Sequence, residues 1–220
     1  MITVTRTKEF IHNFIDVPEC PRVVIDGQRY YDTPVGKFKS VTTILGEKLT
    51  NKYIQEWKNR VGEEQASKVS TQAAKRGTAI HSLAESYLMN DKNWKRGAMP
   101  FNLELFSKIR PILDLNVGSI YGIEIPLYSA ELKAAGTCDL LAGYRGINSV
   151  IDFKTSKRIK TENDIESYFI QATSYSIMAE ELTNLRFPQI VIIMAVDHED
   201  PIVFVKDREE YEDRTRKLFC

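Results

Sequence analysis

Two strand-like segments, Gly136-Thr137-Cys138-Asp139 and Ile151-Asp152-Phe153-Lys154-Thr155, indicate both the fold and the chemistry of this chain. Both are rich in β-branched and apolar residues and lie on either side of turn residues, which predicts two neighbouring strands joined by a tight turn. Asp152 and Lys154 are two residues apart, so they project from the same face of their strand. Antiparallel pairing across the turn would bring Asp139 beside Asp152. The pattern therefore predicts two carboxylates and an ammonium group on one face of a sheet.

Such a group predicts a bound cation. Carboxylates that are buried without a partner are costly, and a divalent cation would neutralise both Asp139 and Asp152. Hard oxygen ligands suit Mg²⁺ or Mn²⁺. Lys154 could then orient or activate water, or stabilise the charge that builds up on a phosphate. The alternative is a solvated strand face, because an isolated Asp-x-Lys pair often arises by chance.

The rest of the chain predicts a central mixed sheet flanked by helices, in the α/β (α+β) class. A hairpin is expected around Asp26-Gly27, followed by a loop from Pro34 onward. Helix breaks are expected at Gly62 and Gly77, and a kink or break at Pro111. The expected strands cover residues 120–128, 132–144, 150–154, 188–196 and 201–206. The expected helices cover residues 41–45, 51–89 in three pieces, 101–116, 163–182 and 207–218.

The composition is typical of one soluble globular domain. Of the 220 residues, 43% are hydrophobic and 27% are charged, which allows a sizeable core and excludes a disordered, collagen-like or coiled-coil chain. Thirty basic and thirty acidic side chains give zero net charge, which argues mildly against a protein that coats nucleic acid non-specifically. The three widely spaced cysteines, the polar start and the short apolar stretches predict a cytoplasmic protein with free thiols and no membrane contact.

Two further polar motifs lie on expected helices. Arg76-Gly77-Thr78 precedes His81, which is either a metal ligand projecting onto the sheet or a capped surface histidine. Gln171 and Tyr175 are four residues apart and therefore share one face of a helix. They either contact a phosphodiester or Lys154, or they pack against the sheet with a satisfied amide.

In this order, the motifs resemble the RecB-type branch of the PD-(D/E)XK nuclease superfamily, over roughly residues 39–205. The stretch from Ser40 to Leu45, ahead of a helical region with Trp57, also resembles the mitochondrial genome maintenance exonuclease family and its phage relatives. The matching elements are Gly77-Thr78 with His81, then Glu124, Gly136-Thr137 with Asp139, Asp152 with Lys154, and Gln171 with Tyr175. The resemblance implies a restriction-endonuclease-like core with an N-terminal helical arm. It implies one nuclease domain over residues 1–220, with a hairpin region over 1–38, a DNA-binding arm over 39–76 and a catalytic core over 77–220.

The same resemblance implies a metal-dependent deoxyribonuclease that attacks phosphodiesters with activated water. The residues it assigns to catalysis are Lys154, Asp152, Asp139 and Glu124, with Glu131 as a competitor for the role of Glu124. The ligands it assigns to one or two Mg²⁺ or Mn²⁺ ions are His81, Asp139, Asp152 and the backbone carbonyl of Phe153. The cysteine cluster of the iron–sulfur relatives is missing and the chain has no Gly-x-x-x-x-Gly-Lys-Ser/Thr loop. Neither an iron–sulfur cluster nor an ATP site is therefore expected.

Basic and aromatic residues in the helical region predict a path for single-stranded DNA, through phosphate attraction and base stacking. The alternative is a solvated helix with Trp57 in the core. The substrate-binding residues we expect are Gln171, Tyr175, Thr78, Arg76, Trp57, Tyr53 and Lys157, with further basic residues at Lys48, Lys52, Lys58, Arg60, Lys68 and Lys75. A loop that carries Trp94 could close over the substrate. His198, within an acidic run, is expected in an exposed turn and not in a metal site.

The leading hypothesis is a metal-dependent exonuclease that prefers single-stranded DNA and acts in replication, recombination or repair, in a phage or bacterial setting. Replication or recombination proteins would then be candidate partners. One alternative is a structure-specific or sequence-specific endonuclease on the same fold. The other is a DNA-binding recombination accessory module without catalysis. A closed circular single strand separates the first two, because a strict exonuclease cannot cut it.

Overall fold

The computed structural model describes residues 8–219, and for residues 50–54 it describes the backbone alone. The expected DNA contact through the side chain of Tyr53 therefore lies outside the described residues. The strands are β1 (Arg22–Ile25), β2 (Gln28–Thr33), β3 (Gly36–Ser40), β4 (Val117–Ser129), β5 (Ala134–Tyr144), β6 (Ile147–Ser156), β7 (Gln189–Val196) and β8 (Ile202–Asp207). The helices are α1 (Val41–Leu45), α2 (Asn51–Val61), α3 (Glu63–Leu88), α4 (Pro100–Asn116), α5 (Glu166–Thr183) and α6 (Glu209–Phe219). Single turns of other helix types cover Gly46–Thr50 and Glu162–Ile165.

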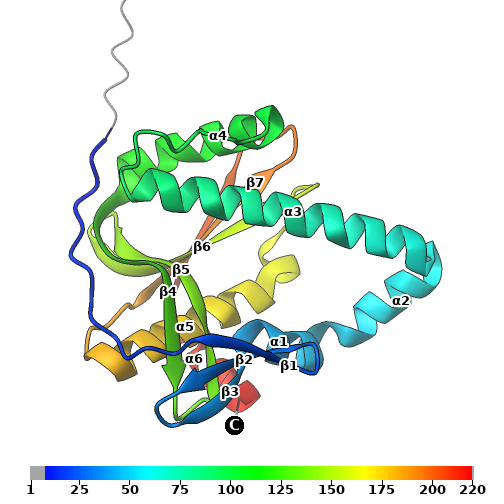
Figure 1. The fold of residues 1–220 in the computed structure, drawn as a ribbon, viewed down its shortest axis with the longest axis horizontal. Helices are drawn as coiled ribbons and strands as arrows, with labels where there is room; N and C mark the ends of the chain where they lie inside the picture. The colour runs from blue at the N-terminus through cyan, green and yellow to red at the C-terminus, as the bar shows by residue number, and fades with distance from the viewer. Residues whose placement is uncertain (1–7, 220) are drawn as a thin grey trace, which may run out of the picture.

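All eight strands form one mixed sheet with helices on both faces, which confirms the expected fold class. The sheet runs in the order β1-β2-β3-β5-β6-β7-β8, with β4 also paired to β5. Helices α3 and α4 lie on one face, and α5 and α6 lie on the other (Figure 1). Each face has its own buried cluster, with Phe106 and Tyr144 in one and Phe169 and Phe187 in the other. No helix within residues 8–219 is long and apolar enough to cross a bilayer.

The sheet forks along one edge of β5. The first part of that edge pairs in parallel with the end of β3, at Ala134 and Ala135. The last part pairs antiparallel with β6, ending at Leu140 opposite Ile151. Between these two stretches, residues 136–138 pair with β4 on their other side, and residues 136–139 have no strand partner on this edge among the described residues. The fork therefore opens at the Gly-Thr-x-Asp segment.

Three local predictions need correction. The residues after Pro34 form β3 and not a loop, because β3 pairs with both β2 and β5. Gly77 does not break α3, since a glycine in a helix interior costs only about 1 kcal/mol relative to alanine, and α3 packs against the sheet and α4. Pro111 does not end α4 either. It lies on the exposed side of α4, where water can satisfy the carbonyl that loses its amide donor. The hairpin around Asp26-Gly27 is confirmed.

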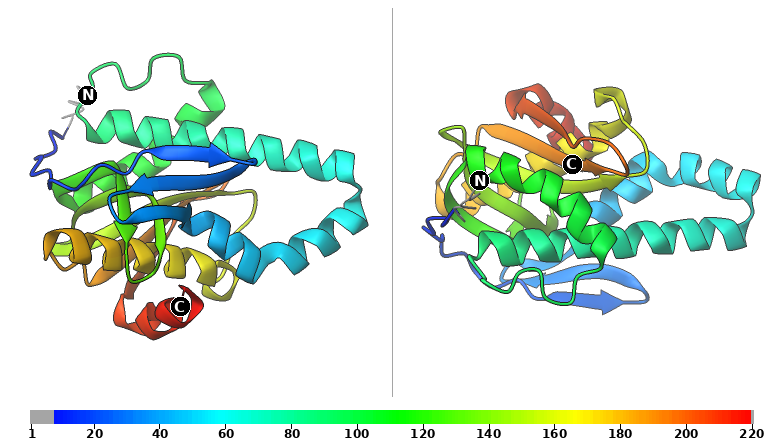
Figure 2. Two further views of the ribbon diagram at one scale, coloured as in Figure 1. Left: turned by 60° about the horizontal axis from the view of Figure 1, so that its bottom comes forward. Right: turned by 90° about the horizontal axis from the view of Figure 1, so that it is seen from above.

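The first half of α3 and all of α2 extend beyond the sheet (Figures 1 and 2). We call residues 51–76 the arm. The expected boundary between residues 76 and 77 falls inside α3, so the arm and the core share one helix. The position of the core residues on α3 therefore fixes the direction in which the arm leaves the sheet.

Candidate active site

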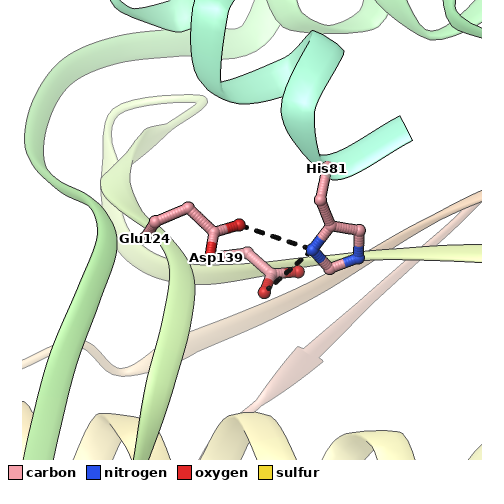
Figure 3. Close-up of side chains that lie close together, drawn as sticks. All are labelled: His81, Glu124 and Asp139. Carbon is pink, nitrogen blue, oxygen red and sulfur yellow. Dashed lines mark ion pairs between the residues drawn. The ribbon is translucent and has the colours of Figure 1, made fainter. Parts of the chain in front are cut away.

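The side chains of His81, Glu124 and Asp139 converge at the fork, from α3, β4 and β5 respectively (Figure 3). Glu124 lies between Ile123 and Ile125, which pair with Leu140 and Cys138, so the β4–β5 register places it opposite Asp139. Its φ is +45°, a left-handed conformation that costs a non-glycine residue roughly 1–2 kcal/mol. Backbone strain of this kind is concentrated at functional sites.

One ring nitrogen of His81 faces both carboxylates. Nδ1 lies 3.4 Å from Oε1 of Glu124 and 3.5 Å from Oδ1 of Asp139. The other ring nitrogen, Nε2, donates a hydrogen bond to the carbonyl of Phe153 at 2.9 Å. This contact fixes the orientation of the ring, as a partner on the far nitrogen does for metal-binding histidines. The structure thus places the Phe153 carbonyl beside the group as the acceptor of the histidine hydrogen bond.

Asp139 bridges the fork. Its Oδ2 accepts a hydrogen bond from the backbone N–H of Phe153 at 2.8 Å, in the region where the β5–β6 ladder has ended. Asp139 is buried, and burial together with the charge of Asp152 raises its pKa to about 7, against the opposing effects of His81, Lys154 and the Phe153 amide. A carboxyl group with this pKa binds a proton or a cation readily near neutral pH.

Asp152 and Lys154 form a buried ion pair, with Nζ 2.5 Å from Oδ2. Asp152 is 1% exposed, and within residues 8–219 its carboxylate oxygens have no close polar partner besides the Lys154 ammonium. Burial alone would lower the pKa of Lys154, but the charges of Asp152 and Asp139 and the hydrogen bond to Asp152 raise it above its usual value. Nζ also lies 5.1 Å from the ring centroid of Tyr168, a cation–π contact. Lys154 is therefore a fixed, protonated ammonium.

The acids also dominate the titration of His81. Burial would lower its pKa, but the hydrogen bond to Glu124 and the charges of Asp139 and Asp152 outweigh burial and raise it to about 9. The carboxylates of Glu124, Asp139 and Asp152 therefore favour a positive charge beside them, and the protonated ring of His81 supplies it. A bound cation would supply the same charge and leave the ring neutral, as metal ligation requires.

The donor set fits a divalent cation. One ligand atom from each of His81, Glu124 and Asp139 lies within 4.8 Å of the others. Asp152 is not one of these three residues, but its charge acts on both His81 and Asp139, and its buried carboxylate is paired with Lys154. Two carboxylates and one imidazole are donors that Mg²⁺ or Mn²⁺ accepts. Of the expected ligands, His81 and Asp139 are thus brought together with Glu124, whereas Asp152 is paired with Lys154.

A cleft of about 660 Å³ opens in front of the group. Three of the expected substrate residues line it: Thr78, Gln171 and Tyr175. Tyr175 is buried and lies against Gly136, where an added Cβ would come within 2.8 Å of the tyrosine ring. The glycine of the Gly-Thr-x-Asp segment is therefore needed for this close approach.

Other expected residues lie elsewhere. Arg76 does not line the cleft, because its guanidinium binds Asp197 at the end of β7, 2.6 Å away. Trp57 is half-buried on α2 and Lys157 is exposed after β6, and neither lines the cleft. Trp94 is buried against Tyr87 and Phe106, so it belongs to the core and not to a closing loop. Glu131 pairs with Arg216, and His198 lies in the exposed turn between β7 and β8, as expected.

Sequence reasoning missed one whole wall of the cleft. Arg22, Arg29 and Tyr31 of the β1–β2 hairpin line it, and the register places all three on one face of the hairpin, with Arg22 opposite Tyr31 and Arg29 opposite Val24. The Tyr31 hydroxyl contacts the Thr137 hydroxyl at 3.0 Å. Tyr168, under Lys154, was missed as well. The alternation of arginine and tyrosine in the hairpin could have indicated that one face of the hairpin is functional. It could not have indicated which element that face lies against.

The chain is similar in sequence to two curated proteins. The chain is 28% identical to mitochondrial genome maintenance exonuclease 1 of Mus musculus over 128 residues, which cover 55% of this chain and 38% of the relative. It is 26% identical to the Xenopus tropicalis protein of the same name over 132 residues, which cover 57% and 38%. The chain thus spans less than half the length of these curated relatives. No family model matches it.

A comparison with solved structures finds a partial match to a Eubacterium rectale protein provisionally described as an exonuclease. The TM-score is 0.46 at 14% identity, with coverage of 67% of this chain and 63% of the other. The sequence similarity to the two mitochondrial exonucleases supports the expected kinship with PD-(D/E)XK-like exonucleases.

Proposed function

We propose that this chain is a divalent-metal-dependent deoxyribonuclease of the RecB-like type that degrades single-stranded DNA from an end. The observation that carries the proposal is the group of His81, Glu124 and the buried Asp139, together with the buried Asp152–Lys154 pair, at the fork of the sheet. Buried charges of both signs that share one open cleft are costly for folding and typical of catalysis. The names of the two mitochondrial relatives support an exonuclease.

In this proposal, His81, Glu124, Asp139 and Asp152 hold Mg²⁺ or Mn²⁺, one or two ions. The ion would supply Lewis acidity toward a phosphate oxygen and toward the attacking water. Lys154 donates hydrogen bonds from a fixed position to the water or to the phosphate, and stabilises the negative charge that develops there. Tyr168 and Asp152 hold its ammonium in place. Gln171, Tyr175 and Thr78 contact the phosphodiester from the walls of the cleft.

Charge in the cleft supports a nucleic acid as the substrate. Arg22 and Arg29 are exposed and line the cleft, and neither has an acidic partner in the described part of the chain. Unpaired guanidinium groups are typical phosphate ligands. The arm carries further exposed lysines, Lys68 and Lys75 among them. We propose that a DNA strand follows this basic surface to the metal group, in replication, recombination or repair.

The decisive experiment incubates the purified protein with Mn²⁺ or Mg²⁺ and an end-labelled linear single strand. We expect degradation from an end, which Asp152→Asn and Lys154→Met each abolish. Lys37→Met is the matched control, because Lys37 is exposed on β3 and lies outside the cleft. A wild-type protein that binds the strand and leaves it intact would overturn the proposal in favour of a non-catalytic DNA-binding module. Cleavage of a closed circular single strand would replace the exonuclease by an endonuclease.

A further inference from the structure

A second hollow, of about 320 Å³, adjoins the catalytic cleft and has the opposite character. It lies between the N-terminal segment, the end of α3 and β4. Its lining is mostly apolar and consists of Phe14, Ile15, Met89, Tyr121, Gly122, Ile123, Ile125 and Pro126, with Glu85 and Glu124 on its border. This volume is at the lower end of the range of small-molecule pockets, roughly 300–1,000 Å³. It suits one flat apolar group and not a stretch of polymer.

The hollow and the cleft share a wall. Glu85 and Glu124 line both, and Glu124 belongs to the proposed metal group. A nucleotide whose phosphate lies at that group is therefore one side chain away from the hollow. The basic wall with Arg22 and Arg29 lines the cleft alone, so the phosphate side and the apolar side of the site are separate.

Phe14 is an aromatic platform that is fixed from behind. Its side chain is 51% exposed, and its ring stacks on His12 with centroids 5.0 Å apart and an angle of 22° between the planes. His12 Nε2 in turn contacts the carbonyl of Leu88, at the end of α3, at 2.8 Å. On either side of Phe14, the backbone N–H of Asn13 donates to the carbonyl of Ile120, and that of Ile15 donates to the carbonyl of Tyr121. These two hydrogen bonds hold the segment against β4. A large apolar ring held rigid and half-exposed binds a planar ligand with little loss of entropy.

The charges select a base over a phosphate. Glu124 belongs to the proposed metal group, so Glu85 is the acid left to face a ligand in the hollow; its carboxylate repels a phosphate, whereas it accepts hydrogen bonds from the amino groups of nucleobases. We propose that this hollow holds one unpaired nucleobase, that of the nucleotide next to the cleaved phosphate, stacked on Phe14. The proposal rests on the proposed nuclease function. It also gives a reason for the preference for single-stranded DNA, since a base in this hollow cannot be paired with a second strand.

The first test measures cleavage of single strands that carry one abasic nucleotide at successive positions near the labelled end. We expect the wild-type protein to cut roughly tenfold more slowly when the nucleotide next to the cleaved bond lacks its base, since stacking of one base is worth about this much. Phe14→Ala should cut intact and abasic strands at the same, reduced rate. Phe14→Tyr should keep the difference, and Phe14→Leu should lose most of it because the ring is gone.

Ile11→Ala is the matched control. Ile11 is 64% exposed on the same segment and lies outside the hollow, so the variant should behave as the wild type does. Equal rates on intact and abasic strands in the wild-type protein would overturn the proposal. So would a Phe14→Ala variant that keeps the wild-type difference.

The second test needs no cleavage, so it separates this proposal from the nuclease proposal. A strand with 2-aminopurine at its terminal position is titrated with protein in Ca²⁺, and its emission is followed. Stacking on Phe14 should quench the emission in the wild-type protein and in Ile11→Ala, and not in Phe14→Ala. If the wild-type protein cuts DNA but does not quench the probe, the base pocket is wrong and the nuclease stands. If it quenches the probe through Phe14 but never cuts, the nuclease is wrong and the base site stands.

Discussion

The charged group at the fork of the sheet and the arm carry charge in opposite ways. We call the first the sheet-borne group; it consists of His81, Glu124, Asp139, Asp152 and Lys154. Asp139 and Asp152 are 7% and 1% exposed, and their partners are held by the backbone register or by short contacts. On the arm, Lys68 pairs with Glu64 one helical turn away, at 2.7 Å, with 63% and 84% of the two side chains exposed. Burial makes the charges of Asp139 and Asp152 costly and chemically specific, whereas solvent screens the charges on the arm. Buried charge therefore identifies chemistry, and exposed charge only indicates a path toward it.

The largest expected effect comes from breaking the buried pair. Asp152→Asn leaves the Lys154 ammonium buried without its main partner, and loss of one member of a buried pair costs about 3–5 kcal/mol. We expect cleavage to fall by at least roughly a thousandfold, since a metal ligand and the fixing contact of Lys154 are both lost. Denaturant unfolding and single-turnover cleavage measure the two effects.

A double variant separates folding from catalysis in this pair. Asp152→Asn combined with Lys154→Met should regain most of the lost stability, because no unpaired charge stays buried, and should remain inactive. On the arm, Lys68→Met should change stability by less than about 0.5 kcal/mol. If the double variant is no more stable than Asp152→Asn, the pair does not have the coupling that its 2.5 Å contact implies.

The next effect is a pH dependence that belongs to the sheet-borne group alone. The pKa of Asp139 is raised from 3.8 to about 7 and that of His81 from 6.5 to about 9, so the folded state binds more protons than the unfolded state in both ranges. Its stability in the absence of metal should therefore fall as pH rises from about 4 to 9, by a few kcal/mol, since one pKa unit is worth about 1.4 kcal/mol. Melting curves with EDTA test this.

Metal and matched histidine variants sharpen that result. Mg²⁺ or Mn²⁺ should stabilise the protein increasingly as pH rises, because the ligands must be deprotonated. His81→Asn should remove the part of the slope between pH 6.5 and 9, and His198→Asn, in the exposed turn, should leave it unchanged. Equal slopes in wild type and His81→Asn would show that the acids do not hold a proton on His81.

The sheet-borne group is also the part of the site that could be predicted from the sequence. Asp152 and Lys154 follow a period of two, which is a local pattern, and the nearby turn gives the antiparallel partner. The choice between Glu124 and Glu131 required the β4–β5 register, which the sequence does not reveal. Arg22 and Arg29 were missed because the hairpin reaches the cleft through the pairing of β3 with β5, between residues about 95 positions apart in the chain.

The arm was predicted correctly as helical but not in its details. The expected break at Gly77, directly after the arm, relied on the weak helix preference of glycine, and packing of α3 on the sheet overrides it. Arg76 looked like a DNA contact because it lies next to other basic residues, whereas the fold places Asp197 beside it. Tertiary partners of this kind join elements that are far apart in sequence, so a local pattern cannot reveal them.

Two glycines, Gly136 on β5 and Gly77 on α3 next to the arm, allow a comparison of the sheet and the helix at a smaller scale. An alanine Cβ at Gly136 would lie 2.8 Å from the buried ring of Tyr175, and at Gly77 it would meet nothing within 4 Å. Gly136→Ala should therefore destabilise by about 1–3 kcal/mol through overpacking, and Gly77→Ala should stabilise by about 1 kcal/mol through helix preference. Thermal unfolding of the two variants measures both signs. A Gly136→Ala/Tyr175→Leu double variant should recover stability, and a failure to do so would place the strain elsewhere.

The smallest effect on stability is expected in the arm, and it should be visible in DNA binding alone. Lys58→Gln and Lys75→Gln should each leave stability within about 0.5 kcal/mol of wild type. If their side chains contact phosphates, each should lower the slope of log affinity against log salt by about 0.7 for a single strand. Lys37→Gln, on the exposed face of β3, removes the same charge outside the arm and should leave the slope unchanged. Equal slopes in all three variants would mean that the strand reaches the metal group along the hairpin wall with Arg22 and Arg29, and that exposed charge on the arm does not form its path.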